Sequence, residues 1–251
     1  MKVANKTDIG LIRLVNEDRA LIEPDFNGYT LAIIADGMGG HQAGEIASQM
    51  AAERVRRELS TAGSDLTFND YSAIIVKAIE KANNEIFSYA SNHEEFHGMG
   101  TTVVVALVSD TQIIAAHIGD SRAYIIEDDK IRQLTEDHSL VNELVKSGQI
   151  SPSDANRHPH RNVLTRALGT DKCVEVDFQT FSWKQNDILM LCTDGLSGLI
   201  DDNHIHSVLR SSMHLEAKVD QLVQSALDAG GEDNITVILL ENEPNSSNEK
   251  G

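Results

Sequence analysis

The sequence predicts an α+β protein in which helices cover the outer faces of antiparallel sheets. Predicted strands outnumber predicted helices along the chain. The strand patterns between residues 101 and 134 follow one another with short connections, which favours an antiparallel meander over strand–helix–strand crossovers. The long helical patterns each carry one apolar stripe, and packing against a sheet would bury that stripe.

The N-terminal part of the chain begins with strands and continues with helices. The predicted strands cover residues 3–9, 19–23 and 29–36, and the predicted helices cover residues 42–59 and 70–90. In the first helix, Ile46, Met50 and Leu59 belong to one apolar stripe at helical spacing. At the start of the second helix, Asn69 or Asp70 is of the residue type that caps a helix.

The C-terminal part returns to strands and ends with helices and a final strand. Strands are predicted at 101–108, 112–118, 122–126, 130–134, 175–181, 187–193 and 234–241, and helices at 138–147, 202–211 and 215–229. The stretch 148–162 is polar and contains Pro152 and Pro159, so we predict a loop there. No composition shift or linker divides the chain, which predicts one domain over residues 1–242 and a disordered polar tail over residues 243–251.

The charge balance is acidic, with 39 Asp and Glu residues against 21 Lys and Arg residues and a formal net charge of −18. Nucleic acid and anionic membranes attract basic faces, so neither is expected as the main partner. Cys173 and Cys192 show no CxxC spacing, which indicates a reducing compartment. No apolar run approaches the length of a membrane span, and the N-terminus lacks a signal-peptide pattern. We therefore expect a free cytoplasmic protein.

Four Asp residues stand at the ends of predicted core strands. Asp36 ends the apolar run from residue 31, and Asp120 and Asp194 end two later strands. Asp233 directly precedes the last strand. Taken one at a time, each is compatible with an ordinary turn, because Asp–Gly and Gly–Asp are common turn dipeptides. Gly37 lets the backbone approach another group closely and leaves its carbonyl free as an oxygen ligand.

If these carboxylates converge, cations are needed to balance them. Two unit charges about 4 Å apart repel by roughly 4 kcal/mol at an effective dielectric constant near 20. Oxygen-only ligands suit Mn²⁺ or Mg²⁺, and the sequence shows no His/Cys motif of the kind that binds zinc. The pattern therefore predicts a divalent-cation site at the strand ends.

Short motifs follow one another along nearly the whole chain, from about Thr7 to Leu240. They are Asp8-Ile9-Gly10, Arg13 with Asn16-Glu17-Asp18, Asp36-Gly37-Met38-Gly39-Gly40-His41, Gly100-Thr101-Thr102, Gly119-Asp120-Ser121-Arg122, Leu134-Thr135 with Asp137-His138-Ser139, Leu164-Thr165-Arg166-Ala167-Leu168-Gly169, Thr193-Asp194-Gly195-Leu196 and Gly231-Glu232-Asp233-Asn234-Ile235-Thr236. In this order they resemble the bacterial metal-dependent serine/threonine protein phosphatases of the PPM family, also called type 2C.

The resemblance implies a four-layer α-β-β-α sandwich with a metal centre at one end of two central antiparallel sheets. It implies two Mn²⁺ or Mg²⁺ ions per active site, with Asp36 bridging both. Asp194 and Asp233 would hold the first ion, and the carbonyl of Gly37 would bind the second. Bacterial relatives often hold a third ion, which would lie near Asp120 and Asp194.

The resemblance also implies roles for residues around the ions. Arg13 would grip the substrate phosphate, and Glu17 and Asp18 would bind water on the ions. Animal members carry a His two residues after the bridging Asp as proton donor to the leaving alkoxide. Met38 stands at that position here, so His41 becomes a candidate acid, with water on a third ion as its competitor.

The loop 148–162 matches the family's flap, a segment beside the active site that contacts substrate. Arg161 in this flap is a candidate phosphate contact, although an Arg on a surface loop is often only solvated. Exchanging the flap should alter substrate choice more than activity on small phosphoesters. His117 is interpreted as a satisfied core or rim histidine, and His138 as a helix cap.

The sequence thus predicts hydrolysis of phosphoserine and phosphothreonine monoesters by metal-activated water, without a covalent intermediate. Cys192 is interpreted as a small core residue rather than a nucleophile. The expected partners are phosphorylated proteins and the serine/threonine kinase that the enzyme opposes, and the expected oligomeric state is a monomer. The alternatives are a hydrolase of small phosphoesters, a phosphoprotein-binding module without catalysis, and an acidic protein that binds Ca²⁺, although no EF-hand spacing supports the last.

Overall fold

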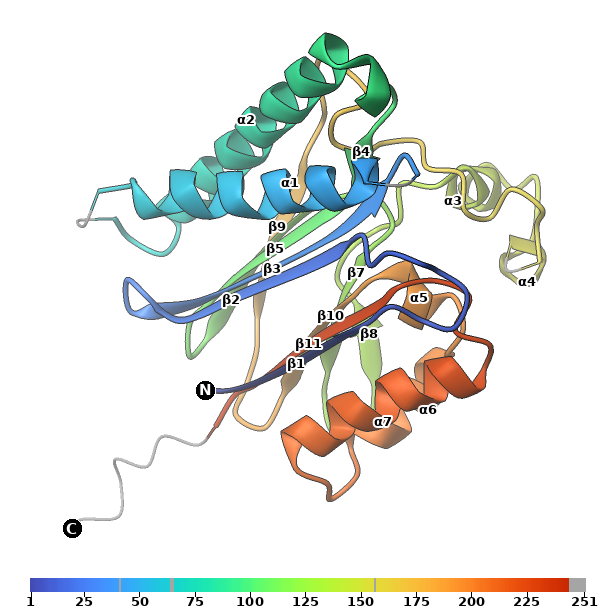
Figure 1. Ribbon diagram of the computed structural model, residues 1–251. Coiled ribbons are helices and arrows are strands. Elements are labelled where there is room, and N and C mark those ends of the chain that lie inside the picture. The colour runs from blue at the N-terminus through green and yellow to red at the C-terminus, as the bar shows by residue number, and fades with distance from the viewer. Residues whose placement is uncertain (41, 64–65, 156, 244–251) are drawn as a thin grey trace.

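The computed structural model describes residues 1–40, 42–63, 66–155 and 157–243. Two antiparallel sheets pack face to face between helices (Figure 1). The first sheet has the strand order β2-β3-β5-β6-β9, with β4 paired to β3. Its strands are β2 (Asp18–Phe26), β3 (Tyr29–Met38), β4 (Gly100–Thr101), β5 (Val103–Val108), β6 (Gln112–Ile118) and β9 (Asp177–Ser182). The predicted α+β sandwich is confirmed.

The second sheet joins the two ends of the chain. Its strand order is β1-β11-β10-β7-β8, with β1 (Lys2–Asp8), β11 (Ile235–Glu241), β10 (Ile188–Cys192), β7 (Arg122–Ile126) and β8 (Ile131–Gln133). In register, Asp8 pairs with Ile235, and Cys192 pairs with Arg122. The segments before β11, after β10 and before β7 therefore leave this sheet at the same end.

Helices cover the outer face of each sheet (Figure 1). The helices α1 (Ala43–Ser60) and α2 (Asp70–Asn92) lie over the first sheet, and α6 (Asp202–Leu209) and α7 (Leu215–Asp228) lie over the second. Shorter helices are α3 (Leu140–Lys146), α4 (Pro152–Ala155), α5 (Asp194–Ser197) and a 3-10 turn (Glu94–Phe96). Among the described residues, no helix is long and apolar enough to cross a membrane.

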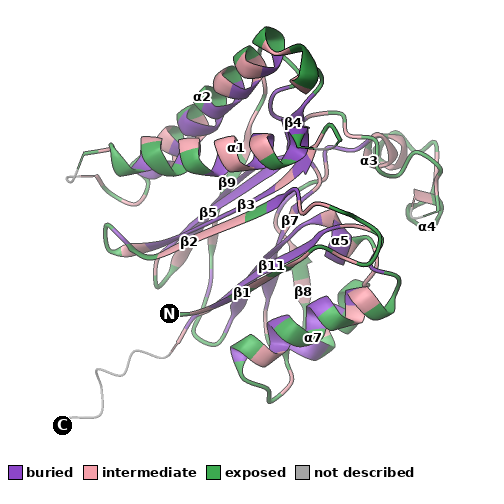
Figure 2. Cartoon of the chain, in the orientation of Figure 1, coloured by how far each residue is buried: buried purple, intermediate pink, exposed green. Residues whose placement is uncertain are grey.

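Three apolar layers hold these elements together, and β3 contributes to two of them. Leu31 and Ile33 pack under α1 and α2, whereas Ala32 and Ile34 face the second sheet. Side chains alternate between the faces of a strand, so a strand buried on both faces reads as a continuous apolar run. Figure 2 shows the corresponding pattern in the helices, whose buried residues face the sheets.

The structure differs from the sequence prediction mainly in short segments. The predicted strand 101–108 is split, because β4 pairs with the end of β3 while β5 pairs with its middle. The predicted loop 148–162 contains α4, and the single turn α5 was not predicted. Asn69 precedes α2 without a side-chain capping bond, and the Asp70 carboxylate instead accepts hydrogen bonds from Thr67. Residues 244–251 of the predicted tail lie outside the described residues.

Candidate active site

A pocket of about 180 Å³ at one end of the sandwich collects the four Asp residues singled out in the sequence. Asp36 belongs to β3 and Asp120 follows β6 in the first sheet, whereas Asp194 follows β10 and Asp233 precedes β11 in the second. All four side chains are half-buried. The other residues lining the pocket are Arg13, Glu17, Gly37, Met38, Gly39, Gly40, Thr102, Asn162 and Leu164. The four carboxylates therefore converge on one pocket.

The backbone of Asp36 is held by the short strand β4 and the residue after it. The Asp36 carbonyl accepts hydrogen bonds from Thr102 N–H (2.8 Å) and Thr101 Oγ1 (2.8 Å), and Asp36 N–H donates to Thr102 Oγ1 (3.0 Å). A Cβ added to Gly37 would lie 2.0 Å from the carbonyl oxygen of Gly44 in α1. Glycine is therefore required at position 37, because the end of β3 touches the start of α1.

Asn234 organises the loop between β1 and β2, which we name the Arg13 loop (residues 9–16). Its amide donates to the carbonyls of Ile9 (2.9 Å) and Val15 (3.0 Å), and its side-chain oxygen accepts the N–H of Glu17 (2.8 Å). Asn234 is buried, so these bonds form away from water. One side chain thereby fixes the loop that carries Arg13 against the turn that carries Asp233.

Arg13 is the cation that lines the Asp pocket within the described part of the chain. Its Nη2 lies 2.6 Å from Asp233 Oδ2, and its Nη1 lies 3.8 Å from Glu17 Oε2. The Arg13 side chain is 44% exposed, so it can also meet a ligand that enters from solvent. The pocket therefore places one guanidinium among the carboxylates of the four Asp residues and of Glu17.

Glu17 lines the pocket, Asp18 is its neighbour in the chain, and both are buried. Asp18 Oδ2 accepts hydrogen bonds from Thr193 Oγ1 (2.9 Å) and Thr236 Oγ1 (2.6 Å). In contrast, Asp18 Oδ1 and Glu17 Oε1 are buried without a hydrogen-bond partner. Because a buried carboxylate oxygen without a partner is costly, these two atoms indicate that the site is built for a further ligand.

The pKa values of three carboxyls at the pocket, those of Asp18, Asp36 and Asp120, are raised. Burial raises the pKa of Asp36 well above its usual value, and the negative charges of Asp18, Asp194, Asp120 and Asp233 add to the shift. Burial also raises the pKa of Asp18 to about 7 and that of Asp120 to about 8, with Asp194 contributing to both. Crowded carboxyls keep their protons unless a cation compensates them, so oxygen donors and raised pKa values together fit a hard divalent cation.

The remaining predicted site residues lie elsewhere. Arg161 lines a neighbouring cavity of about 530 Å³, and its Nη2 lies 3.7 Å from Glu232 Oε2. Asp120, Asp194 and Asn162 line both this cavity and the Asp pocket. Arg161 therefore stands beside the Asp pocket rather than in it. His41 lies outside the described residues.

A hydrogen-bonded support lies behind the turn that carries Asp120. The ring Nδ1 of His138 accepts the backbone N–H of Gly119 (3.1 Å), and the backbone N–H of His138 donates to the Gly119 carbonyl (3.0 Å). This leaves the proton on Nε2, which faces Asp177 Oδ2 at 3.2 Å. Although His117, His138 and Asp177 place possible ligand atoms within 4.8 Å of one another, the bond from Gly119 holds His138 in the tautomer that cannot give Nε2 to a metal.

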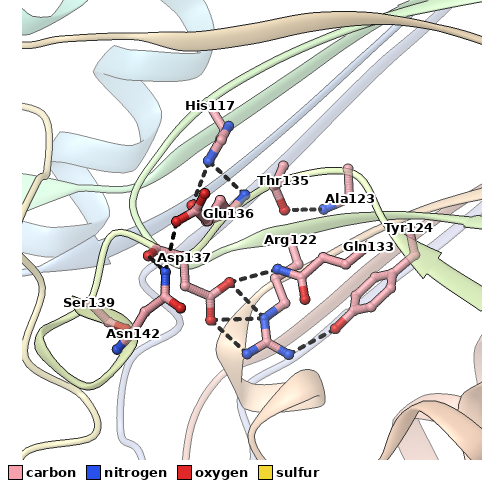
Figure 3. A network of polar contacts seen from close by, with 10 residues as sticks. All are labelled: His117, Arg122, Ala123, Tyr124, Gln133, Thr135, Glu136, Asp137, Ser139 and Asn142. Atoms are coloured by element: carbon pink, nitrogen blue, oxygen red, sulfur yellow. Dashed lines mark hydrogen bonds and ion pairs between the residues drawn. The ribbon is translucent and has the colours of Figure 1, made fainter. Parts of the chain in front are cut away.

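The two histidine interpretations have different outcomes. His117 is buried and bonded through Nε2 to the backbone of Glu136, as expected of a satisfied core histidine. The prediction that His138 caps a helix is wrong, because Ser139 is the N-cap of α3 and accepts the N–H of Asn142. Beside them, Asp137 makes several hydrogen bonds with Arg122, which also donates to the Tyr124 hydroxyl (Figure 3).

Sequence reasoning missed several residues that position the site. The quoted motifs contain Thr101, Thr102, Thr193, Asn234 and Thr236, but their side-chain bonds become visible only when the strands are assembled. Thr193 and Asn234 each stand next to a strand-end Asp, and this is the signal that could have indicated them. Thr101, Thr102 and Thr236 carry no such signal. Asn162 was part of the predicted flap, but nothing in its spacing indicated that it lines the pocket.

Comparison with known proteins agrees with this geometry. The curated serine/threonine phosphatase Stp of Listeria innocua is 42% identical over 94% of this chain and 94% of its own length. The crystal structure of serine/threonine phosphatase Stp1 from Staphylococcus aureus superposes with a TM-score of 0.92 and 37% identity, covering 97% of this chain and 95% of that one. The catalytic domain of PstP, solved in complex with two manganese ions, has a TM-score of 0.83 and 32% identity over 96% of this chain and 97% of its own.

The family profile covers the parts of the chain that build the pocket. A profile described as protein phosphatase 2C matches residues 13–236, which include Arg13 and all four pocket Asp residues. Enzymes of this family are metal-dependent hydrolases that act on phosphorylated proteins. The chain therefore belongs to the protein phosphatase 2C family.

Proposed function

We propose that this protein hydrolyses phosphoserine and phosphothreonine on proteins, using two Mn²⁺ or Mg²⁺ ions held in the Asp pocket. The observation that carries the proposal is the convergence of four carboxylates from four strand ends around one Arg. A relative with the same fold was solved with two manganese ions, which supports the cation count. The enzyme would oppose a serine/threonine kinase, as a cytoplasmic monomer.

The described residues can supply the ligands. Asp36 would bridge the two ions, Asp194 and Asp233 would complete one site, and the Gly37 carbonyl would serve the other. Asp120 and Asp194 line the pocket together and would hold a third ion. When bound, such ions supply positive charge beside a phosphoryl group and lower the pKa of the attacking water.

The chain itself would bind and orient the phosphate. Arg13 donates to Asp233 in the structure, and its exposed guanidinium can donate to phosphate oxygens in the same planar fork geometry. The unpartnered oxygens of Glu17 and Asp18 would accept hydrogen bonds from water, which would orient that water. The roles of His41 as proton donor and of Arg161 as a further phosphate contact remain predictions from the sequence.

Two other functions use the same pocket. A hydrolase of small phosphoesters would share the chemistry, and the neighbouring cavity beside the flap favours a larger substrate. A phosphoprotein-binding module without catalysis would not need a full set of carboxylates, and here all four are in place.

The test is phosphate release from a phosphothreonine peptide with Mn²⁺, with EDTA, and with the variant Asp36→Asn. We expect activity that requires Mn²⁺ and falls at least about 100-fold in the variant, because the variant removes a charge at the reacting centre. Asp128→Asn is the matched control, since Asp128 is an exposed turn residue at the other end of β7. Release that survives both EDTA and Asp36→Asn would overturn the proposal.

A further inference from the structure

Exposed apolar side chains gather on the Arg13 loop. Among the described residues, eight large apolar side chains are exposed, and four of them are Ile9, Leu11, Ile12 and Leu14. Leu14 is 94% exposed and Ile12 is 68% exposed, which is unusual for neighbours in one short loop. A cluster of apolar side chains in water marks an interaction site more often than scattered single residues do.

The backbone of this loop is fixed while its side chains stay in solvent. Leu11 N–H donates to the Gly231 carbonyl (2.8 Å), and Gly10 N–H donates to Asp8 Oδ1 (2.9 Å). A Cβ added to Gly10 would lie 2.3 Å from the Asp233 carbonyl oxygen, so the loop lies directly against the turn before β11. With the bonds from Asn234, these contacts hold the apolar side chains in place without burying them.

The loop borders the pocket that would receive the phosphoresidue. Arg13 lines that pocket. Ile12 and Leu14 precede and follow Arg13 in the chain, so the Cα atom of each lies about 3.8 Å from that of Arg13. Asn162 and Leu164 also line this pocket, and the exposed Val163 lies between them in the sequence. The pocket is therefore lined by carboxylates, and exposed apolar residues adjoin two of the segments that line it.

We propose that the Arg13 loop binds apolar side chains of the substrate next to its phosphoresidue, and so sets a preference for phosphoserine or phosphothreonine flanked by residues such as Leu. This proposal rests on the proposed phosphatase function. An extended peptide advances about 3.3 Å per residue, so residues up to three positions from the phosphoresidue lie within about 10 Å of it and can reach the loop. The occupant is a phosphopeptide segment because the loop is continuous with the phosphate-binding pocket.

The test uses phosphothreonine peptides that carry Leu or Ser at each position from three before to three after the phosphothreonine. For the best-placed Leu, we expect kcat/KM to exceed that of the matching Ser peptide by about tenfold, the effect of removing part of one Leu side chain from water. In the double variant Ile12→Ser/Leu14→Ser, the ratio of the two kcat/KM values should fall toward one. Hydrolysis of p-nitrophenyl phosphate by the same variant reports any separate damage to Arg13.

Met213→Ser is the matched control, because Met213 is an exposed apolar residue between α6 and α7 and does not line the pocket. It should keep the wild-type ratio of kcat/KM values. A wild-type ratio near one at every position, with Mn²⁺-dependent hydrolysis intact, would overturn this inference and leave the phosphatase function standing. A ratio unchanged in the double variant would also overturn the inference. If, in addition, the wild-type protein sedimented as a dimer and the double variant as a monomer, the loop would instead bind a second copy of the chain. No hydrolysis of any phosphoester would instead refute the proposed function.

Discussion

Asp residues mark the strand ends at both ends of the sandwich, yet the two ends differ in what surrounds the carboxylates. Two Asp residues from each sheet can be compared at each end. The pocket end has Asp36, Asp120, Asp194 and Asp233, and the opposite end has Asp25, Asp110, Asp128 and Asp187. At the opposite end, Asp25 is exposed in β2, and Asp110 and Asp128 are exposed in turns. Asp128 Oδ1 accepts a hydrogen bond from Arg210.

The opposite end shows what a carboxylate needs when no cation is intended. Asp187 is buried there and burial raises its pKa, but its Oδ2 accepts the N–H of Lys184 at 2.7 Å. At the pocket end, buried oxygens of Glu17 and Asp18 have no such partner. The comparison teaches that an Asp at a strand end carries little information by itself, and that convergence without compensation distinguishes a cation site from a set of turns.

The largest expected effect separates the two ends by activity. Asp194→Asn should lower kcat/KM on a phosphothreonine peptide by on the order of 100-fold to 1000-fold, because it removes charge that a cation needs. Asp110→Asn, at an exposed turn of the opposite end, should stay within about twofold. Equal losses in the two variants, measured at saturating Mn²⁺, would contradict the difference between the ends.

A pair of buried asparagines sharpens the comparison. Asn234→Ala removes three hydrogen bonds at the pocket end and should lower the free energy of unfolding by about 3 kcal/mol, with a rise in KM as the Arg13 loop loosens. Asn242→Ala removes the bond from its Nδ2 to the Asp110 carbonyl and should cost about 1 kcal/mol without changing KM. Urea unfolding and steady-state kinetics measure both. If Asn242→Ala raised KM as much as Asn234→Ala, the Arg13 loop would not be the cause.

The pH dependence of stability tests the crowding of carboxyls directly. Asp18 and Asp120 have pKa values of about 7 and about 8 in the folded protein against 3.8 in the unfolded chain. Between pH 4 and pH 8 the folded protein therefore retains protons that the unfolded chain has lost, and the free energy of unfolding falls as pH rises. In EDTA, the urea midpoint should drop from pH 5 to pH 8, and the drop should be smaller in Asp120→Asn. A midpoint that rises over this range in EDTA would contradict the account.

The smallest expected effect concerns the two cysteines. Cys192 is buried in β10, and burial raises the pKa of its thiol to about 12, so it is not a nucleophile at neutral pH. Cys192→Ser should keep phosphatase activity within about twofold, and thiol reagents should label the exposed Cys173 in the folded protein but not Cys192. Loss of activity with a retained fold would restore a role for Cys192.

The long elements and the pocket carboxylates were predictable from the sequence for a physical reason. A helix such as α1 repeats its apolar stripe over several turns, and β3 is apolar throughout because both faces are buried. Asp36 and Gly37 stand out because a polar turn interrupts that run.

The rest depends on tertiary contacts. A segment of four residues, as in α4 or α5, is too short to show a period, so neither helix was predicted. The bonds of Asn234 join residues more than 200 positions apart, which no local pattern records. The exposure of Leu14 likewise depends on how the Arg13 loop is anchored. From the sequence alone, an apolar residue such as Leu14 would be expected in the core.

The most direct test of the central claim is the location of Mn²⁺ in a crystal of this protein. Anomalous difference density collected at the manganese edge should show at least two peaks among Asp36, Asp194 and Asp233, and none among the Asp residues of the opposite end. Peaks absent from the pocket at millimolar Mn²⁺, or present instead at the opposite end, would contradict the conclusion that convergent strand-end carboxylates form the metal centre.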